Sequence, residues 1–363
     1  MAGKNKNIIK VQYPEQNYSV IFNKRTGFFA RIEKKGFEEP FWAKAGPELL
    51  DISITNYCEK NCNFCYRNSN KFGKHIKLDD YKNIIKQAQE LGVFQIAIGG
   101  GNPNQHPDFI EILKTTFAAG IVPSYTSNGD GLTDNILKAT EKYCGAMAIS
   151  AYKPYSKLDS VIKKVKRFDI KLNIHFVLDK YSINDAINWL ENPPAFLSKI
   201  NALIFLNYKP VNASVDFLLN KSNKLELFFK LVNQKFPFKI GFDSCSVSGI
   251  VQNMKVNPVY YESCEAARFS AFISEDLKMY PCSFMINTEM YGDLQENSIK
   301  DIWQRDKSFV EFRNRIKNNN CTNCKFRNLC NGGCMFMPEI NLCNMNELNK
   351  KYDAPTLHIP NDE

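Results

Sequence analysis

Residues 49–65 read LLDISITNYCEKNCNFC. The first seven residues, Leu49–Thr55, are apolar and β-branched enough to form a buried strand, and Cys58, Cys62 and Cys65 follow that strand directly. Three thiolates on one short loop can hold three irons of a cubane iron–sulfur cluster and leave the fourth iron open to a small molecule. A zinc loop that takes its fourth ligand from a distant part of the chain is the alternative.

Strands and helices alternate after this loop. Apolar residues recur at helical spacing from Asp79 to Leu91, and Val93–Ile98 then reads as a second buried strand. The pattern continues with helices expected near 107–119, 133–143, 155–168, 183–190 and 224–233, and with strands near 121–126, 146–150, 171–178 and 202–206. Six such strand-then-helix units predict a parallel sheet wound with helices, with the chemistry at the carboxyl ends of the strands.

The spacing C-x3-C-x2-C, with Phe64 before the last cysteine, resembles the signature of the radical S-adenosylmethionine (radical SAM) superfamily. The resemblance implies an α/β fold, a partial (β/α)6 TIM-like barrel over residues 49–240. It also implies that a [4Fe–4S] cluster on Cys58, Cys62 and Cys65 binds SAM, and that one electron cleaves SAM to a 5′-deoxyadenosyl radical. A flavodoxin- or ferredoxin-type electron donor is implied as well.

The loops after later strands are similar to the SAM-binding segments of that family. Residues 99–103 read GGGNP where relatives read Gly-Gly-Glu-Pro, so Asn102 replaces the glutamate that recognises the methionyl amino group. An amide oxygen accepts a hydrogen bond but brings no charge, which predicts a weaker contact. Ordinary turns are the alternative at these loops, because Gly, Ser and Asn are common turn residues. The resemblance implies SAM contacts by Phe64, Gly100, Gly101, Asn102, Thr126, Ser127, Asn128 and Ser150.

A second group of cysteines, spaced C-x2-C-x5-C-x3-C, runs from Cys321 to Cys334. With a Pro-Cys pair upstream and a lone cysteine downstream, it resembles the SPASM extension of peptide-modifying radical SAM enzymes, which binds two auxiliary [4Fe–4S] clusters. The glycine that the family places shortly before the Pro-Cys pair is missing from residues 275–278. By analogy, one cluster would use Cys245, Cys264, Cys282 and Cys334, and the other would use Cys321, Cys324, Cys330 and Cys343.

A pair of zinc ribbons is the alternative for this region, because C-x2-C is also a zinc spacing. The number of cysteines favours clusters. Twelve cysteines less three for the SAM-binding loop leave nine, and two four-iron clusters take eight of them. Cys144 remains, and its place before a strand puts it at the opposite end of the barrel from the site.

The segments before and after the predicted barrel form separate parts of the chain. Residues 1–48 read as an N-terminal β-hairpin extension, residues 241–348 as the SPASM domain and residues 349–363 as a tail. Many peptide-modifying relatives carry a leader-binding winged helix at the N-terminus, and this segment is too short for one. The leader of a precursor peptide would then be recognised by the hairpin, by the barrel mouth or by a separate leader-binding protein.

The composition indicates a cytoplasmic protein. No apolar run is long enough for a signal peptide or a membrane span, and many cysteines without export indicate metal or redox chemistry rather than disulfides. The formal charge of +9 comes from scattered lysines. Such a surface suits an acidic peptide better than nucleic acid.

The function that the resemblance implies is maturation of a ribosomally synthesised precursor peptide, by a thioether, C–C or C–O cross-link or another two-electron oxidation. Asp243 and Glu265 are candidates for the general base that most cross-linking schemes need. His175, on an expected strand, could face the cavity, but it is interpreted as a satisfied core histidine. Two other functions remain open. One is a maturase that oxidises a Cys or Ser of a sulfatase to formylglycine, and the other is a non-catalytic metal module that binds nucleic acid.

Overall fold

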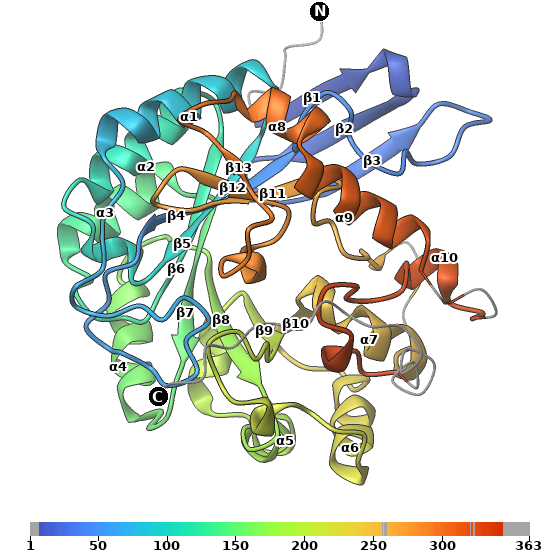
Figure 1. Ribbon diagram of the computed structural model, residues 1–363. Coiled ribbons are helices and arrows are strands. Elements are labelled where there is room, and N and C mark those ends of the chain that lie inside the picture. Colours follow the sequence, from blue (N-terminus) through green and yellow to red (C-terminus); the bar gives the residue numbers. More distant parts are fainter. Residues whose placement is uncertain (1–6, 256, 258–259, 320, 322–323, 344–363) are drawn as a thin grey trace, which may run out of the picture.

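The computed structural model describes residues 7–255, 257, 260–319, 321 and 324–343, so the expected tail at 349–363 lies outside the described residues. The described strands form two sheets. The smaller one is antiparallel, in the order β1-β2-β3, and the larger one has ten strands in the order β10-β9-β8-β7-β6-β5-β4-β11-β12-β13. Helices cover the outer face of the large sheet, and the small sheet lies beside the region of α8 and α9 (Figure 1).

The strands of the large sheet are short and mostly parallel. They are β4 (Leu49–Thr55), β5 (Gln95–Gly100), β6 (Val122–Ser127), β7 (Ala146–Ala151), β8 (Leu172–Leu178), β9 (Ala202–Asn207), β10 (Lys239–Phe242), β11 (Ser270–Ile273), β12 (Lys278–Tyr280) and β13 (Gly292–Asp293). Every pair from β10 through β11 is parallel, whereas β12 and β13 are antiparallel to their neighbours.

The helices follow the strands along the chain. They are α1 (Leu78–Glu90), α2 (Phe109–Ala118), α3 (Asp134–Tyr143), α4 (Ser156–Val165), α5 (Ile183–Glu191), α6 (Asn223–Val232), α7 (Val247–Asn253), α8 (Ile299–Arg305), α9 (Lys307–Lys317) and α10 (Arg327–Cys330). In α1 the buried residues recur at helical spacing, which fixes the face that packs on the sheet: Tyr81, Ile84, Ile85 and Ala88. No described helix is long and apolar enough to cross a bilayer.

The six predicted strand-and-helix units from 49 to 233 are confirmed, and the sheet is larger than they require. β10 adds a further parallel strand beside β9. On the other side, β11 pairs in parallel with β4, in a register that joins Ser270 to Leu49 and Ile273 to Ile52. The sheet therefore runs without a break from the barrel into the cysteine-rich C-terminal part of the chain. Within the described residues its two edge strands, β10 and β13, are not paired with each other, so the barrel is open.

The alternation of side chains along β4 separates the core from the barrel interior. Leu50, Ile52 and Ile54 are fully buried in the hydrophobic core that the helices share. Because successive side chains of a strand point to opposite faces, Asp51 and Ser53 face the interior of the barrel. The polar residues of this strand are thus directed toward the site.

The N-terminal segment forms the smaller sheet from β1 (Ile8–Tyr13), β2 (Tyr18–Asn23) and β3 (Phe29–Glu33). The predicted hairpin corresponds to β2 and β3, and β1 was not expected. Arg31 of β3 forms ion pairs with Glu48 at 2.9 Å and with Glu265 at 2.6 Å. These ion pairs link the small sheet to the residue directly before β4 and to the C-terminal region.

Candidate functional site

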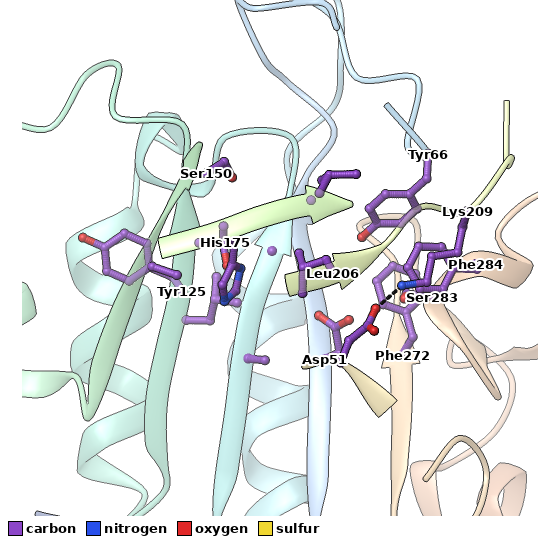
Figure 2. A pocket seen from close by; sticks show the side chains of 18 of the residues that line it. Asp51, Tyr66, Tyr125, Ser150, His175, Leu206, Lys209, Phe272, Ser283 and Phe284 are labelled. Carbon is purple, nitrogen blue, oxygen red and sulfur yellow. Dashed lines mark hydrogen bonds and ion pairs between the residues drawn. The ribbon is translucent and has the colours of Figure 1, made fainter. Parts of the chain in front are cut away.

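A cavity of about 640 Å³ opens at the carboxyl ends of the parallel strands, where barrel folds of this type hold their sites. Residues from every strand between β4 and β9 contribute to its wall, together with residues of the C-terminal region. Figure 2 shows Ser150, His175 and Tyr125 on one side of it, and Tyr66, Lys209 and Phe284 on the other. The three sulfurs of the cysteine loop, on Cys58, Cys62 and Cys65, also line this cavity.

The cysteine loop is held from both ends by hydrogen bonds. The Thr55 hydroxyl at the end of β4 accepts from the Tyr57 amide at 2.9 Å, and the Cys58 amide donates to the carbonyl of Asn70 at 3.0 Å. Near the last cysteine, the Cys65 amide donates to the Cys62 carbonyl at 3.1 Å. These hydrogen bonds fix the path of the loop between β4 and Cys65.

Gly100 and Gly101 allow the next loop to approach the cysteine loop. The Gly101 amide donates to the Thr55 carbonyl at 2.7 Å. A Cβ on Gly100 would lie 2.0 Å from that same carbonyl oxygen, and one on Gly101 would lie 2.1 Å from the carbonyl oxygen of Tyr57. Both glycines line the cavity, as expected, and the structure adds that any side chain would push the two loops apart.

The side chain of Asn102 makes hydrogen bonds that the sequence does not predict. Its side chain is 1% exposed and is not part of the cavity wall. Its amide nitrogen donates to the Asp130 carbonyl at 3.0 Å, and its oxygen accepts from the Ser127 hydroxyl at 3.3 Å and the Asn128 amide at 3.2 Å. Because these bonds use the side-chain amide, the geometry disfavours its expected contact with the methionyl group of SAM.

The other residues expected to contact SAM do line the cavity: Phe64, Thr126, Ser127, Asn128 and Ser150. Phe64 lies against the ring of Tyr152, with centroids 5.5 Å apart. The side-chain nitrogen of Asn128 lies 3.6 Å from the sulfur of Cys58, within the range of a hydrogen bond to sulfur. The loop after β6 is thus linked directly to the cysteine loop.

His175 lines the cavity, so its interpretation as a core residue is wrong. Its Nδ1 lies 3.3 Å from the Thr126 hydroxyl, and burial lowers the pKa of the imidazole to about 4. The ring is therefore neutral at pH 7. The period-two alternation of β8, in which it faces inward, was the signal that could have placed it.

The first predicted set of auxiliary ligands is brought together although its members are far apart in sequence. Cys245, Cys264, Cys282 and Cys334 line one small cavity beside Phe284. Three of the four, all but Cys334, also line the main cavity. Four thiols around one apolar hollow are the ligand type that an iron–sulfur cluster takes, and this hollow borders the main cavity.

The second predicted set also converges. Burial, followed by the neighbouring thiols of Cys324 and Cys343, raises the pKa of Cys321 to about 11. Burial and the thiols of Cys343 and Cys321 raise the pKa of Cys330 to about 12. Cys321 thus lies in the field of Cys324 and Cys343, and Cys330 in the field of Cys343 and Cys321. Cys144 lies at the end of α3 and lines neither cavity.

The two candidate general bases are both held by cations. Asp243 forms an ion pair with Lys209 and accepts a hydrogen bond from the Ser246 hydroxyl at 2.8 Å. Burial lowers the pKa of Lys209, but the charge of Asp243 outweighs it and the pKa is raised overall. Glu265 is bound by Arg31 as described above. Both carboxylates line the cavity.

Asp51 is a site residue that the sequence analysis missed. It lines the cavity from the middle of β4, and burial raises the pKa of its carboxyl group to about 7, against the opposing charge of Arg67. Within an apolar strand it reads as an isolated polar residue. The signal was the alternation of polar residues at 51, 53 and 55, which marks the inward face.

Family models match two parts of the chain. The radical SAM superfamily model matches residues 52–188, and the SPASM model, an iron–sulfur cluster-binding domain, matches residues 264–325. A radical SAM domain binds a [4Fe–4S] cluster and SAM, and a SPASM domain binds auxiliary iron–sulfur clusters. The two cysteine-lined regions fit these groups, because each gathers soft thiol ligands at a cavity.

Similar proteins cover most of the chain. Mycofactocin maturase MftC of Mycolicibacterium smegmatis is 21% identical over 80% of this chain and 78% of its own length. PqqA peptide cyclase of Bradyrhizobium diazoefficiens is 21% identical over 79% and 81%. The structure of Streptococcus suis SuiB bound to S-adenosylmethionine has a TM-score of 0.69 at 17% identity, over 90% of this chain and 94% of that one. The chain therefore contains a radical SAM domain, matched over residues 52–188, and a C-terminal SPASM iron–sulfur domain, matched over residues 264–325.

Proposed function

We propose that this protein is a peptide maturase. It takes a hydrogen atom from a ribosomally synthesised precursor peptide and installs a cross-link, as a thioether, C–C or C–O bond, or another two-electron oxidation. The observation that carries the proposal is the shared cavity, whose wall contains both the SAM-binding cysteine loop and three auxiliary ligands, Cys245, Cys264 and Cys282. A substrate in this cavity lies between the site of radical formation and a site that can take up an electron.

Similar proteins support this substrate class. MftC is named a mycofactocin maturase, and the PqqA enzyme is named a peptide cyclase. SuiB has also been solved bound to its precursor peptide SuiA, with a TM-score of 0.68 to this chain at 17% identity, over 91% of this chain and 94% of that one. The leader of the peptide would bind the small N-terminal sheet, the cavity mouth or a separate leader-binding protein, and a flavodoxin- or ferredoxin-type protein in the cytoplasm would supply electrons.

In this proposal the residues of the site are cluster ligands, loop glycines or SAM contacts. When bound, SAM and its cluster supply the radical that removes hydrogen. Cys58, Cys62 and Cys65 hold that cluster, and Gly100 and Gly101 keep the adjacent loop close to it. The two auxiliary clusters would take the two predicted sets of four cysteines, which gives three [4Fe–4S] clusters in all. The side chains that face SAM in the cavity would be Phe64, Thr126, Ser127, Asn128 and Ser150.

The test is anaerobic incubation of the reconstituted protein with SAM, a reductant and synthetic peptides encoded by short open reading frames beside its gene. The expected product is about two mass units lighter than the peptide for each event, because a cross-link or oxidation removes two hydrogens. A sulfatase-motif peptide is the comparison substrate. Conversion of that peptide alone would contradict the proposal, as would an unchanged mass with one deuterium gained from heavy water.

A further inference from the structure

Asp51 stands out among the acidic residues of the cavity. The described wall contains three carboxylates, on Asp51, Asp243 and Glu265. Asp243 forms an ion pair with Lys209, and Glu265 forms one with Arg31. The lone pairs of these two carboxylates are therefore largely occupied. Among the residues that the structure describes, none donates a hydrogen bond to the Asp51 carboxylate, and its oxygens face the cavity (Figure 2).

The position of Asp51 is central. On β4 it is paired in register with Ala97 of β5 and with Phe272 of β11, so it sits where the barrel and the C-terminal region share one sheet. A Cβ on Gly99 would lie 3.6 Å from the Asp51 oxygen, so the absence of a side chain there leaves space beside the carboxylate. Tyr66, next to Cys65, lines the same cavity (Figure 2).

A buried cation, Arg67, acts electrostatically on this carboxylate. The Arg67 side chain is 2% exposed, forms an ion pair with Glu275, and leaves its Nε and one terminal nitrogen without a hydrogen-bond partner among the described residues. Its charge opposes the effect of burial on Asp51. Burial favours the protonated form of Asp51 and Arg67 favours the ionised form, so a proton can be gained or lost near neutral pH.

We propose that Asp51 is the general base of the cross-linking reaction. It accepts the proton that a thiol, phenol or similar X–H group of the peptide loses as its heteroatom bonds to the carbon radical. The X–H bond breaks, its electron pair stays on X and forms the X–C bond, and the carboxylate becomes a carboxylic acid. The one electron left over would pass to the auxiliary cluster that Cys245, Cys264, Cys282 and Cys334 would hold beside the cavity. The inference rests on the proposed function. It assigns the role to Asp51 rather than to Asp243 or Glu265, which hold cations of the protein.

The test follows hydrogen removal and cross-linking separately. The full-length reconstituted protein is incubated with SAM and a precursor peptide from the neighbouring open reading frames, carrying deuterium on its core carbons. For Asp51→Asn we expect deuterium still to appear in 5′-deoxyadenosine, while the cross-linked product falls by roughly 100-fold or more, the usual contribution of a general base. Asp51→Glu, which keeps a carboxylate, should recover part of the product.

Measuring deuterium transfer and cross-linked product together distinguishes a general base from a residue that positions the peptide. Equal product from Asp51→Asn and wild type would overturn the assignment, and loss of deuterium transfer along with the product would do so too, because it would mean that Asp51 positions the peptide. If Asp243→Asn or Glu265→Gln instead transferred deuterium without cross-linking, the base would be that residue. A wild-type protein that modified none of the peptides would overturn the proposed function itself, and this inference with it.

Discussion

The side-chain amide of Asn128 lies 3.6 Å from the sulfur of Cys58 and is directed by the bond that the Asn128 backbone makes with Asn102. An N–H group that donates to a cluster thiolate stabilises the more negative, reduced cluster and raises its reduction potential. The Asn128 side chain is therefore placed to stabilise the reduced form of the cluster that the cysteine loop would hold.

We expect Asn128→Leu to lower the reduction potential of the SAM-binding cluster, because the donor to Cys58 is removed. The measurement is an anaerobic redox titration followed by electron paramagnetic resonance, without SAM. Asn173→Leu is the matched control, since Asn173 also lines the cavity but bonds to Asn201 at 2.8 Å. An equal or higher potential in Asn128→Leu would show that the contact does not act on the cluster.

Asn102→Glu should weaken SAM binding, by about tenfold, although it restores the residue common in relatives. The glutamate would lose the donor to the Asp130 carbonyl and bring a charge against that oxygen, so the loop that carries Asn128 would shift. Asn102→Asp, which keeps acceptors of similar length, should have an intermediate effect. Calorimetric titration with SAM checks the series. Tighter binding by Asn102→Glu would mean that its side chain turns into the cavity.

Three clusters imply about 12 irons per chain after anaerobic reconstitution, at four irons each. The variant with alanine at Cys58, Cys62 and Cys65 should lose about a third of the iron and stay brown, because the auxiliary sets do not share these ligands. Iron and zinc analysis checks this. Loss of all iron in the variant, or zinc with about four irons in wild type, would contradict the two auxiliary clusters.

Replacing Cys321 and Cys324 with alanine should stop peptide modification while SAM is still cleaved to 5′-deoxyadenosine, because these residues lie outside the main cavity and leave the SAM-binding loop intact. Chromatography of both products from one reaction makes the measurement. If cross-linked peptide formed at the wild-type rate, the second cluster would have no part in the reaction.

The raised pKa of Asp51 also predicts how stability depends on pH. Between pH 4 and about 7 the unfolded chain ionises this group while the folded protein keeps it protonated, so the free energy of unfolding falls as pH rises, by on the order of a few kcal/mol. Asp51→Asn removes this cost, and its melting temperature should exceed that of wild type more at pH 8 than at pH 5. Asp79→Asn, at an exposed position, is the control. Equal differences at both pH values would contradict the prediction.

The sequence predicts the local part of this structure and misses the long-range part. Strands 49–55 to 202–206 were recognisable because each apolar run is followed by a helix with its own periodicity. β11 was not, because Ser270–Ile273 is four residues long and pairs with a strand more than 200 residues earlier, which no local pattern reports. Cysteine spacing suggested both ligand sets, but only the fold shows that the first borders the main cavity.

Local sequence patterns likewise predict some of the site residues and miss others. Ser127, Asn128 and Ser150 follow or end strands, so their place at the cavity could be expected from the strand order. The true partners of Asn102 could not, because they lie in a neighbouring loop. Asp51 was not predicted, because a single acidic residue in an apolar run does not by itself show that alternate side chains of the strand face the barrel interior.

The parallel pairing of β4 with β11 has a consequence for synthesis of the chain. A ribosome releases β4 long before it releases residues 270–273, so one edge of the nascent sheet stays open until the C-terminal third emerges. The Trp303 indole, which donates to the Ala43 carbonyl at 2.6 Å, closes the same region later still. Stopping translation before this point should leave an aggregation-prone half-barrel, so the cysteine-rich part cannot be cut away to obtain a free-standing SAM-cleaving fragment.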